Sequence, residues 1–511
     1  MKYTIDINGK TRATDYSWQF GFGNDHAFQM HRTDFCEHLK LVHDELGIKY
    51  NRFHGIFDDD MLTRQQLSEF IPLPGADKVF EKNFRQCGHV FDNCLKCGVK
   101  PFVELSFMPS SLAKGKKTGL HYKNNICMPK DLSDWSDYIK SFVEFLLDRY
   151  GKEEVESWYF EVWNEPDLPT FFAGTQKDYF KLYEVTAKAI KSVDENLRVG
   201  GPSTSAIKWV DEFIAFCEEN KVPYDFVSTH HYPGDGFGNA IGLPNVKGML
   251  QTVSEGAKNG TDLGDVIRDV FYSDDKAKAL PKGRLTVLDD ELVPKCKNVP
   301  VMITEWNSMA IFGAPIHDEK YSAAFVVKTC MDLNNDIDGY MFWCVSDIFE
   351  EIFQINKPFV GSFGIISNDG IPKPNFWGFK MLSELYPERL DVAFRTNEDV
   401  EYAVFKSGDK AQVLVYAQST DRNENEEYEV EFELNKAFSS ATVEIIDDTH
   451  CNPKKLWEDM GAPKNLKLSE VEDIKAKTKL VKEPYEVATN GDVTTIKTTL
   501  RTNDVKFFTL E

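Results

Sequence analysis

Short apolar runs alternate with segments of helical periodicity from about residue 17 to residue 387. The runs are rich in β-branched and aromatic residues, as buried strands are, and the segments between them repeat apolar residues every three or four positions. One such segment carries Phe35, Leu39, Val42 and Leu46 at helical spacing. The predicted strands are Ser17–Gly23, Tyr50–His54, Lys100–Phe107, Trp158–Asn164, Arg198–Gly201, Phe226–His230, Val301–Glu305 and Gly339–Ser346.

Eight strand–helix units in this order predict an α/β fold, a (β/α)8 TIM barrel spanning residues 15–387. The first predicted strand is not followed by a Gly-x-Gly-x-x-Gly sequence, which argues against an open nucleotide-binding sheet.

The pattern changes after Glu384 to alternation at every second residue. Such alternation is typical of antiparallel strands with one buried face, so residues 388–511 are predicted to form a β-sandwich accessory domain. A helical segment is expected near Lys464–Ala476, within this region. Residues 1–14 precede the barrel, and their strand Tyr3–Ile7 is expected to join the sandwich.

One connection of the predicted barrel is unusually long. About 70 residues separate His230 from Val301, including the stretch Gly234–Asn239 and a helical segment near Asp265–Tyr272. In a barrel this connection lies at the catalytic rim, as a wall or lid. A contact between copies of the chain in a homo-oligomer is an equally good interpretation.

Composition and charge narrow the class of partner. The formal net charge of −23 disfavours nucleic acid and anionic membranes, and a neutral ligand is indifferent to it. The first residues lack the apolar core of a signal peptide, and no apolar run reaches the length of a membrane span. Ten cysteines in such a chain predict reduced thiols in the cytoplasm. Cys94 and Cys97 resemble half a zinc site without a second pair, so buried thiols are expected, with no metal and no cofactor.

Two carboxylates stand at strand ends in similar surroundings. In the run Trp158–Asp167 the strand pattern ends before Pro166, which has no N–H to donate to a neighbouring strand. Glu165 therefore lies where the strand gives way to a loop. In the run Val301–Asn307 the short apolar stretch ends at Glu305, which places this second carboxylate at a strand end as well. Two such carboxylates suit the acid and the nucleophile of glycoside hydrolysis, although a single strand-end Glu is usually only solvated.

Polar and aromatic residues follow the other predicted strands at the same end of the barrel, as a sugar pocket requires. Several have a structural interpretation as well: a core histidine, barrel filling, or a solvated loop. Adjacent strand residues face opposite sides, so at most one of His230 and His231 enters the pocket. Glu104 is interpreted as a buried partner of Arg52. The candidate substrate-binding residues are His54, Asn164, His230, Tyr232, Trp343, Glu350 and Glu351.

Trp163-Asn-Glu-Pro166 and Thr304-Glu-Trp-Asn307 resemble the clan A glycoside hydrolases. Further segments, YNRFHG at 50–55, KPFVELSFMP at 100–109, DFVSTHHY at 225–232 and FWCVSDIFEE at 342–351, are similar to glycoside hydrolase family 39, the β-xylosidases. The resemblance implies that Glu165 is the acid/base and Glu305 the nucleophile, and that the seven residues above line the sugar site. Trp306 and the long connection depart from that family.

The expected function is therefore a retaining β-xylosidase that releases xylose from short xylo-oligosaccharides, with Tyr232 donating to Glu305 and Asn164 holding the 2-hydroxyl. Three alternatives stay open. The same machinery can act on another glycoside, a β-glucoside or an α-L-arabinopyranoside. An iduronidase-like activity is disfavoured by Glu350 and Glu351, which would repel a uronate. A non-catalytic carbohydrate-binding protein is the third.

Overall fold

The computed structural model describes all residues except 234–245, 281, 284–287, 297–298, 353–354 and 393. The predicted stretch Gly234–Asn239 lies outside the described residues. Within the described part of the chain, eight parallel strands close into a barrel in chain order, which confirms the predicted fold class. Its strands are β3 (Gly21–His26), β4 (Tyr50–His54), β7 (Lys100–Glu104), β8 (Tyr159–Glu161), β9 (Arg198–Thr204), β10 (Phe226–His230), β11 (Val301–Trp306) and β12 (Gly339–Phe342).

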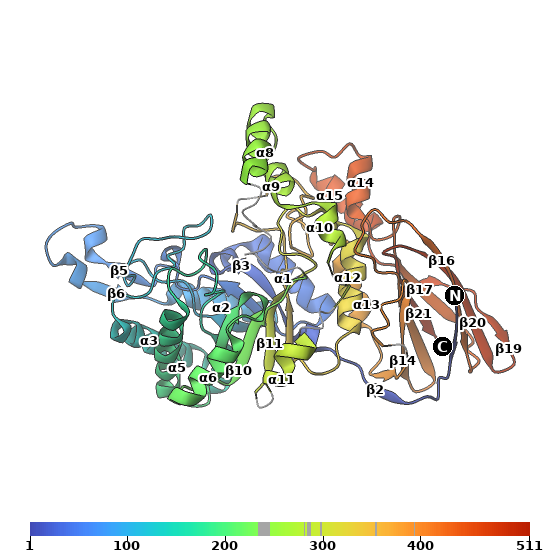
Figure 1. Cartoon of the computed structure of the whole chain (residues 1–511), viewed down its shortest axis with the longest axis horizontal. Coiled ribbons are helices and arrows are strands. Elements are labelled where there is room, and N and C mark those ends of the chain that lie inside the picture. The colour runs from blue at the N-terminus through green and yellow to red at the C-terminus, as the bar shows by residue number, and fades with distance from the viewer. Residues whose placement is uncertain (234–245, 281, 284–287, 297–298, 353–354, 393) are drawn as a thin grey trace.

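Helices surround the barrel (Figure 1), and all of them except α12 and α13 keep a more exposed face. The apolar face predicted for α1 is buried, with Phe35, Leu39, Val42 and Leu46 fully enclosed, and the helix ends at Gly47 in the left-handed conformation. The helices are α1 (Thr33–Leu46), α2 (Arg85–Lys96), α3 (Leu132–Tyr150), α4 (Lys152–Glu156), α5 (Gln176–Val193), α6 (Val210–Asn220), α12 (Lys320–Met331) and α13 (Pro374–Ser383).

Several strand boundaries differ from the prediction: β7 and β12 end earlier, β9 runs further, and the first and fourth strands differ most. Ser17–Phe20 is a 3-10 helix rather than the start of the first strand. The strand predicted to reach Asn164 leaves the regular ladder after Glu161, because Trp163 adopts a φ of 73°, where a strand cannot continue. This early departure turns the following residues toward the barrel mouth.

The barrel interior is layered along its axis. A small apolar cluster of Phe102, Phe226, Met302 and Met341 fills the amino-terminal end. Toward the carboxyl ends of the strands the filling becomes charged, beginning at the fully buried Arg52. Active sites of such barrels lie at this end, so the buried charge marks the functional side.

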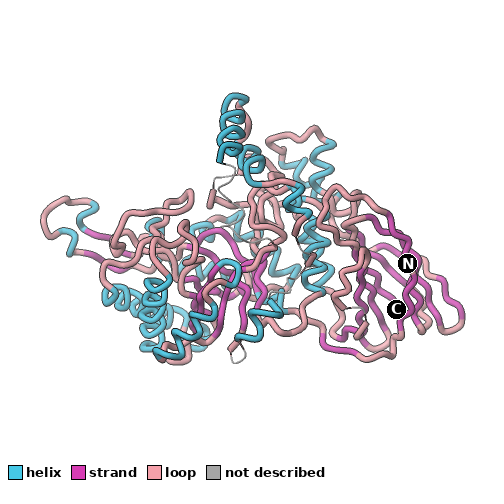
Figure 2. The backbone as a smooth tube through the Cα atoms, viewed as in Figure 1, coloured by secondary structure: helices cyan, strands magenta, loops and turns pink. Residues whose placement is uncertain are grey.

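The predicted sandwich is present beside the barrel (Figure 2) and is built from two sheets around a separate apolar core. β1 (Lys2–Ile5) pairs with β16 in one sheet and β2 (Thr11–Ala13) pairs with β13 in the other. The helical segment predicted near 464–476 appears as α15 (Leu468–Lys477), preceded by α14 (Pro453–Asp459). The other strands of the two sheets include the short β13 (Glu388–Leu390) and the longer β14 (Glu401–Ser407), β15 (Lys410–Tyr416), β16 (Glu427–Leu434), β17 (Ala441–Ile446), β20 (Val493–Arg501) and β21 (Val505–Leu510).

The long connection after β10 contains α8 (Val246–Asn259), α9 (Leu263–Phe271) and α10 (Asp274–Lys278). The helix predicted near Asp265–Tyr272 is α9. Ile267 packs against a cluster that includes Tyr232 and Trp343 at the barrel mouth. The connection therefore lies at the catalytic rim and supplies part of its wall.

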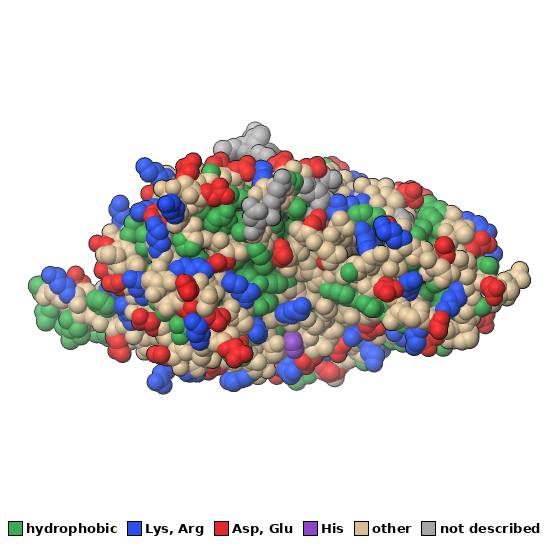
Figure 3. All heavy atoms as spheres, turned by 90° about the horizontal axis from the view of Figure 1, so that it is seen from below, with side chains coloured by type: hydrophobic (Ala, Val, Ile, Leu, Met, Phe, Trp, Pro, Cys, Tyr) green, Lys and Arg blue, Asp and Glu red, His purple; other side chains and the backbone are tan. Residues whose placement is uncertain are grey.

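Charges of both signs are mixed on the face of the molecule that Figure 3 shows. Figure 3 shows Lys and Arg interspersed with Asp and Glu across one whole side of the molecule, and an apolar tip at the end where β5 (Arg64–Gln66) and β6 (Phe80–Lys82) lie. Phe70 and Leu73 are 77% and 65% exposed there. Among the described residues, no helix combines the length and the apolar composition needed to cross a bilayer.

Candidate active site

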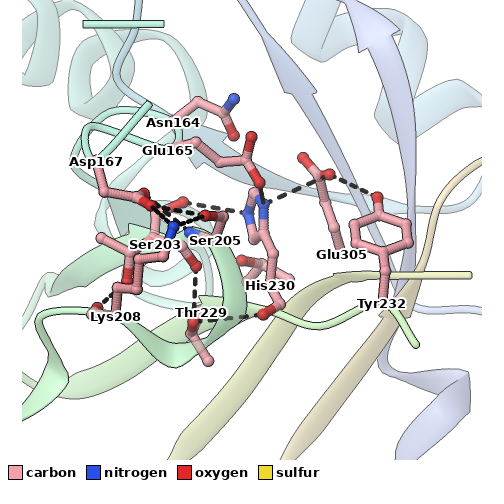
Figure 4. Close-up of polar contacts among 12 residues, drawn as sticks. Asn164, Glu165, Asp167, Ser203, Ser205, Lys208, Thr229, His230, Tyr232 and Glu305 are labelled. Carbon is pink, nitrogen blue, oxygen red and sulfur yellow. Dashed lines mark hydrogen bonds and ion pairs between the residues drawn. The ribbon is translucent and has the colours of Figure 1, made fainter. Parts of the chain in front are cut away.

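A cavity of about 260 Å³ opens at the carboxyl ends of the barrel strands. Glu165, from the segment after β8, and Glu305, on β11, both line it. One carboxylate oxygen of each lies within 4.8 Å of the other, and a ring nitrogen of His230 lies within the same distance of both. Figure 4 shows the two carboxylates flanking the imidazole. The sequence patterns thus mark two side chains that the fold brings face to face.

Both oxygens of Glu305 accept hydrogen bonds. Nη1 of Arg52 donates to Oε1 at 2.8 Å, and the Tyr232 hydroxyl donates to Oε2 at 2.8 Å, which confirms the predicted Tyr232 contact. Burial alone would raise the pKa of Glu305, but His230, Arg52 and His54 favour the charged carboxylate and hold that pKa below its ordinary value. Glu305 is therefore ionised at neutral pH, as a nucleophile must be.

Glu165 is held by its backbone and by its side chain. Its N–H donates to the carbonyl of Ser203 at 2.8 Å, and its φ of 39° is a conformation that residues with a side chain rarely adopt. Nδ1 of His230 lies 2.9 Å from Oε1 of Glu165. Asp167 anchors the same loop by accepting hydrogen bonds from the N–H and hydroxyl of Ser205 at 2.9 and 2.6 Å. The carboxyl group is thus fixed at the mouth rather than free on a loop.

Arg52 is the centre of the charged layer beneath the cavity. Its guanidinium contacts Glu104 at 2.8 Å, Glu161 at 2.7 Å and Glu305 at 2.8 Å, and it is fully buried. The predicted pairing of Arg52 with Glu104 is confirmed. Burial lowers the pKa of Arg52, but the three carboxylates outweigh that effect and raise it.

Replacing Arg52 by methionine should destabilise the protein strongly, because it leaves buried carboxylates without their shared cation. Removing one partner of a buried ion pair costs about 3–5 kcal/mol of unfolding free energy. Chemical denaturation measures the loss. Arg149→Met is the matched control: it breaks an exposed pair with Asp92, for which about 1 kcal/mol or less is expected. Equal effects of the two variants would contradict the role given to Arg52.

His54 links this layer to the cavity wall. Nδ1 lies 2.7 Å from Glu104 and Nε2 lies 3.1 Å from Glu351. Burial lowers the pKa of His54, but Glu104 and Glu351 raise it well above the ordinary value, so the ring is charged. Burial is the main cause that raises the pKa of Glu351 to about 7. The negative charges of Asp25 and Glu305 raise this pKa further, and together these effects outweigh His54, which lowers it.

A pH dependence of stability follows for Glu351. Since its native pKa of about 7 lies above its ordinary value of 4.5, the native state binds the extra proton between these pH values, and stability falls as the pH rises through them. Gln cannot ionise, so the unfolding free energy of Glu351→Gln does not fall in this way. The difference in unfolding free energy, variant minus parent, should therefore increase by about 3 kcal/mol between about pH 4 and about pH 8. Denaturation at several pH values measures the difference. A difference that is independent of pH would contradict the assignment.

The other predicted residues fall into two groups. Oδ1 of Asn164 accepts from Nη2 of Arg52 at 2.9 Å, and the residue lines the cavity. Trp343 lines it too, with its ring centroid 4.9 Å from that of His54; a Cβ at Gly23 would meet this indole at 2.4 Å. Glu350 is different: its carboxylate lies 3.4 Å from Arg32, outside the lining, because that half-buried guanidinium attracts it. Its contact with a sugar stays a prediction.

Two residues of the charged network escaped the sequence patterns. Glu161 accepts from Nε of Arg52 and from the hydroxyl of Thr304 at 2.9 Å. A carboxylate within an apolar strand was the available signal, as for Glu104. The Ser203 hydroxyl lies 3.2 Å from Arg52 and 3.3 Å from Nε2 of His230. A serine in a strand that contains two glycines and a proline carries no comparable signal.

The Glu165–His230–Glu305 group has the spacing of a metal site. Its chemistry favours another interpretation, because both oxygens of Glu305 already accept from Arg52 and Tyr232. The cation that balances this carboxylate is a guanidinium, and a metal ion would have to displace it. The arrangement suits an acid–base and nucleophile pair.

A (β/α)8 barrel that holds two facing carboxylates above a buried arginine defines a glycoside hydrolase. The profile described as glycosyl hydrolases family 39 matches residues 1–259 and 265–494, and the chain belongs to that family.

Full-length relatives agree with this assignment. A β-xylosidase of Caldicellulosiruptor saccharolyticus is 36% identical over 97% of this chain and 95% of its own length. A β-xylosidase of Geobacillus stearothermophilus is 31% identical over 99% and 95%. A solved GH39 β-xylosidase from Caulobacter crescentus superposes with a TM-score of 0.75, at 28% identity and full coverage of both chains.

Proposed function

We propose that the protein is a retaining β-xylosidase that releases xylose from short xylo-oligosaccharides. The observation that carries the proposal is the facing pair Glu165 and Glu305, with closest oxygens within 4.8 Å. Retaining enzymes hold their two carboxyl groups about 5–5.5 Å apart, and inverting enzymes need about 6.5–9.5 Å to fit a water. The choice of xylose rests on the two full-length relatives named β-xylosidase.

In the first step Glu305 attacks the anomeric carbon, and the bond from that carbon to the glycosidic oxygen breaks. Glu165 gives its proton to the departing oxygen, which leaves as an alcohol. Arg52 and Tyr232 keep Glu305 ionised before the attack. His230, 2.9 Å from Glu165, orients that carboxyl group and lies close enough to share a proton with it.

In the second step water hydrolyses the glycosyl ester. Glu165, now a carboxylate, removes a proton from the water as its oxygen attacks the anomeric carbon, and Glu305 departs as carboxylate. Two inversions at the same carbon give the β-anomer of xylose. The charge of Glu305 is absent in the ester, where Glu165 is the carboxylate, and it returns at the end, so the pair carries one negative charge at each stage.

The inner part of the cavity would hold the sugar. Asn164 would bind the 2-hydroxyl, a contact that strengthens as oxocarbenium character develops. His54 and Glu351 offer further hydrogen bonds, and the indole of Trp343 offers a face for the C–H surface of the ring.

The charges of the site disfavour a uronate. Among the described residues that line the cavity there is no Lys or Arg, whereas three carboxylates stand there. Arg52 is already shared by Glu104, Glu161 and Glu305 and has no free donor edge for a fourth carboxylate. A β-glucoside or an α-L-arabinopyranoside differs from a β-xyloside at C5 or in one hydroxyl, and the same machinery could act on either.

A set of nitrophenyl glycosides tests the proposal. The β-D-xyloside should be hydrolysed with the highest kcat/KM among the xyloside, β-D-glucoside, α-L-arabinopyranoside and α-L-iduronide, and proton NMR should show β-xylose as the first product. Preference for another sugar would overturn the substrate, α-xylose as first product would overturn retention, and no turnover of any member would favour a binding protein.

A further inference from the structure

The lining residues that are not fully buried differ in character from the buried ones, which include both catalytic carboxylates. Eight of them are apolar, and we call six of these the outer wall: Leu120, Leu168, Ile267, Phe271, Ile311 and Ile352. They come from the segments after β7, β8, β10, β11 and β12, so five of the eight strand-end segments contribute. Most are half-buried, and Ile352 is 38% exposed. Among the described lining residues that are not fully buried, Thr170 and Glu351 supply the polar side chains.

Specific contacts hold the outer wall together. The N–H of His121, next to Leu120, donates to the carbonyl of Glu351 at 2.7 Å, which joins the segment after β7 to the one after β12. Lys357 pairs with Asp265 of α9 at 3.1 Å. Ile267 packs on the apolar cluster around Phe312 and Trp343. The helix α9 is therefore docked at the rim, and it presents Phe271 to the cavity.

The outer wall is continuous with the catalytic carboxylates, so it surrounds what lies beyond the scissile oxygen. A second xylose there would place hydroxyl groups against side chains that cannot hydrogen-bond to them, and its lost hydration would not be replaced. Burial of an apolar group at the same place is favourable, and it strengthens substrate binding by a factor of about four for each methylene removed from water. The wall thus discriminates by the chemistry of the aglycone, the part of the substrate released as alcohol.

We propose that the outer wall is an aglycone site for apolar alcohols and phenols, and that the enzyme cleaves β-xylosides of such aglycones more efficiently than xylobiose. This inference rests on the proposed β-xylosidase function and adds to it the class of leaving group.

Methyl and hexyl β-D-xylopyranosides provide the first test, because both release a primary alcohol and differ only in apolar length. Hexyl xyloside should have a kcat/KM at least about tenfold above that of methyl xyloside and above that of xylobiose, as burial of two or more methylenes gives. Equal values for the two alkyl xylosides, or a preference for xylobiose over hexyl xyloside, would overturn the inference.

Variants locate the effect. Phe271→Ser should lower the hexyl-to-methyl ratio of kcat/KM about five- to tenfold, and Ile352→Ser, in the segment after β12, should lower it as well. Leu263→Ser is the matched control: Leu263 lies on the same helix, is 56% exposed and is not part of the lining, so ratio and activity should be unchanged. An unchanged ratio in both Phe271→Ser and Ile352→Ser would overturn the placement of the aglycone.

Nitrophenyl β-xyloside separates the two levels of the argument. If it is not hydrolysed, the proposed function fails, and the aglycone site, which rests on that function, fails with it. If it is hydrolysed while the alkyl series shows no dependence on length, only the aglycone site fails.

Discussion

Replacing Glu305 by alanine is expected to lower kcat/KM for β-xylosides about 10⁵-fold or more, because no other group can attack the anomeric carbon from that side. Azide fits the space vacated by the carboxylate and attacks from the same face. With an activated aryl xyloside, azide should restore turnover and give α-xylosyl azide, the product of a single inversion. Steady-state kinetics and the anomeric coupling constant in proton NMR measure both effects.

The matched control for Glu305→Ala is Glu212→Ala, which removes an exposed carboxylate from the first turn of α6. Its activity should equal that of the parent. Circular dichroism shows whether Glu305→Ala is folded. A folded Glu305→Ala protein with parental rates, or one that forms β-xylosyl azide, would show that Glu305 is not the nucleophile.

Replacing Glu165 by alanine is expected to separate substrates by the acidity of their leaving group. For xylobiose, kcat/KM should fall about 10³–10⁴-fold, because the departing sugar oxygen needs the proton that Glu165 supplies. For dinitrophenyl xyloside, whose phenolate leaves unprotonated, kcat/KM should fall less than about tenfold. Azide should raise kcat on the activated substrate and give β-xylosyl azide, since it replaces the water that Glu165 activates.

The comparison of substrates is the decisive part of the Glu165 experiment. A misfolded or misplaced site lowers kcat/KM for both substrates equally, whereas loss of the acid spares one of them. Equal losses on xylobiose and dinitrophenyl xyloside would therefore count against Glu165 as the acid. Opposite azide products from Glu165→Ala and Glu305→Ala would assign the two carboxylates to opposite faces of the sugar.

The arrangement also explains why stability and activity are linked at this site. Arg52 holds Glu305 charged and satisfies Glu104 and Glu161 in the barrel interior. Burial disfavours the charged form of Glu351, whose pKa is about 7, and His54, at 3.1 Å, offsets part of that effect. Buried charges of this kind are costly, so they persist because the chemistry above them requires them.

Much of the fold was present in the order of apolar and polar residues. Alternation of strands and helices predicted the barrel, and the change to period two after Glu384 predicted the sandwich. The catalytic end was also predictable, because the carboxyl ends of parallel strands meet at one rim, whatever their separation along the chain. Glu165 and Glu305 could be named for that reason, as could the contacts of Tyr232 with Glu305 and Arg52 with Glu104.

Other features required the tertiary structure. Sequence alone placed Glu350 and Glu351 together at the site, but Glu351 enters the cavity while Glu350 turns to Arg32, since a loop has no fixed alternation of side chains. Helical spacing identified α9 but not whether Phe271 meets a core or a cavity, because both want the same apolar residue. Periodicity decides which residues are buried within an element. Only the packing of distant segments decides which buried groups meet, and that packing joined Glu161 to Arg52 and placed an apolar rim around two carboxylates.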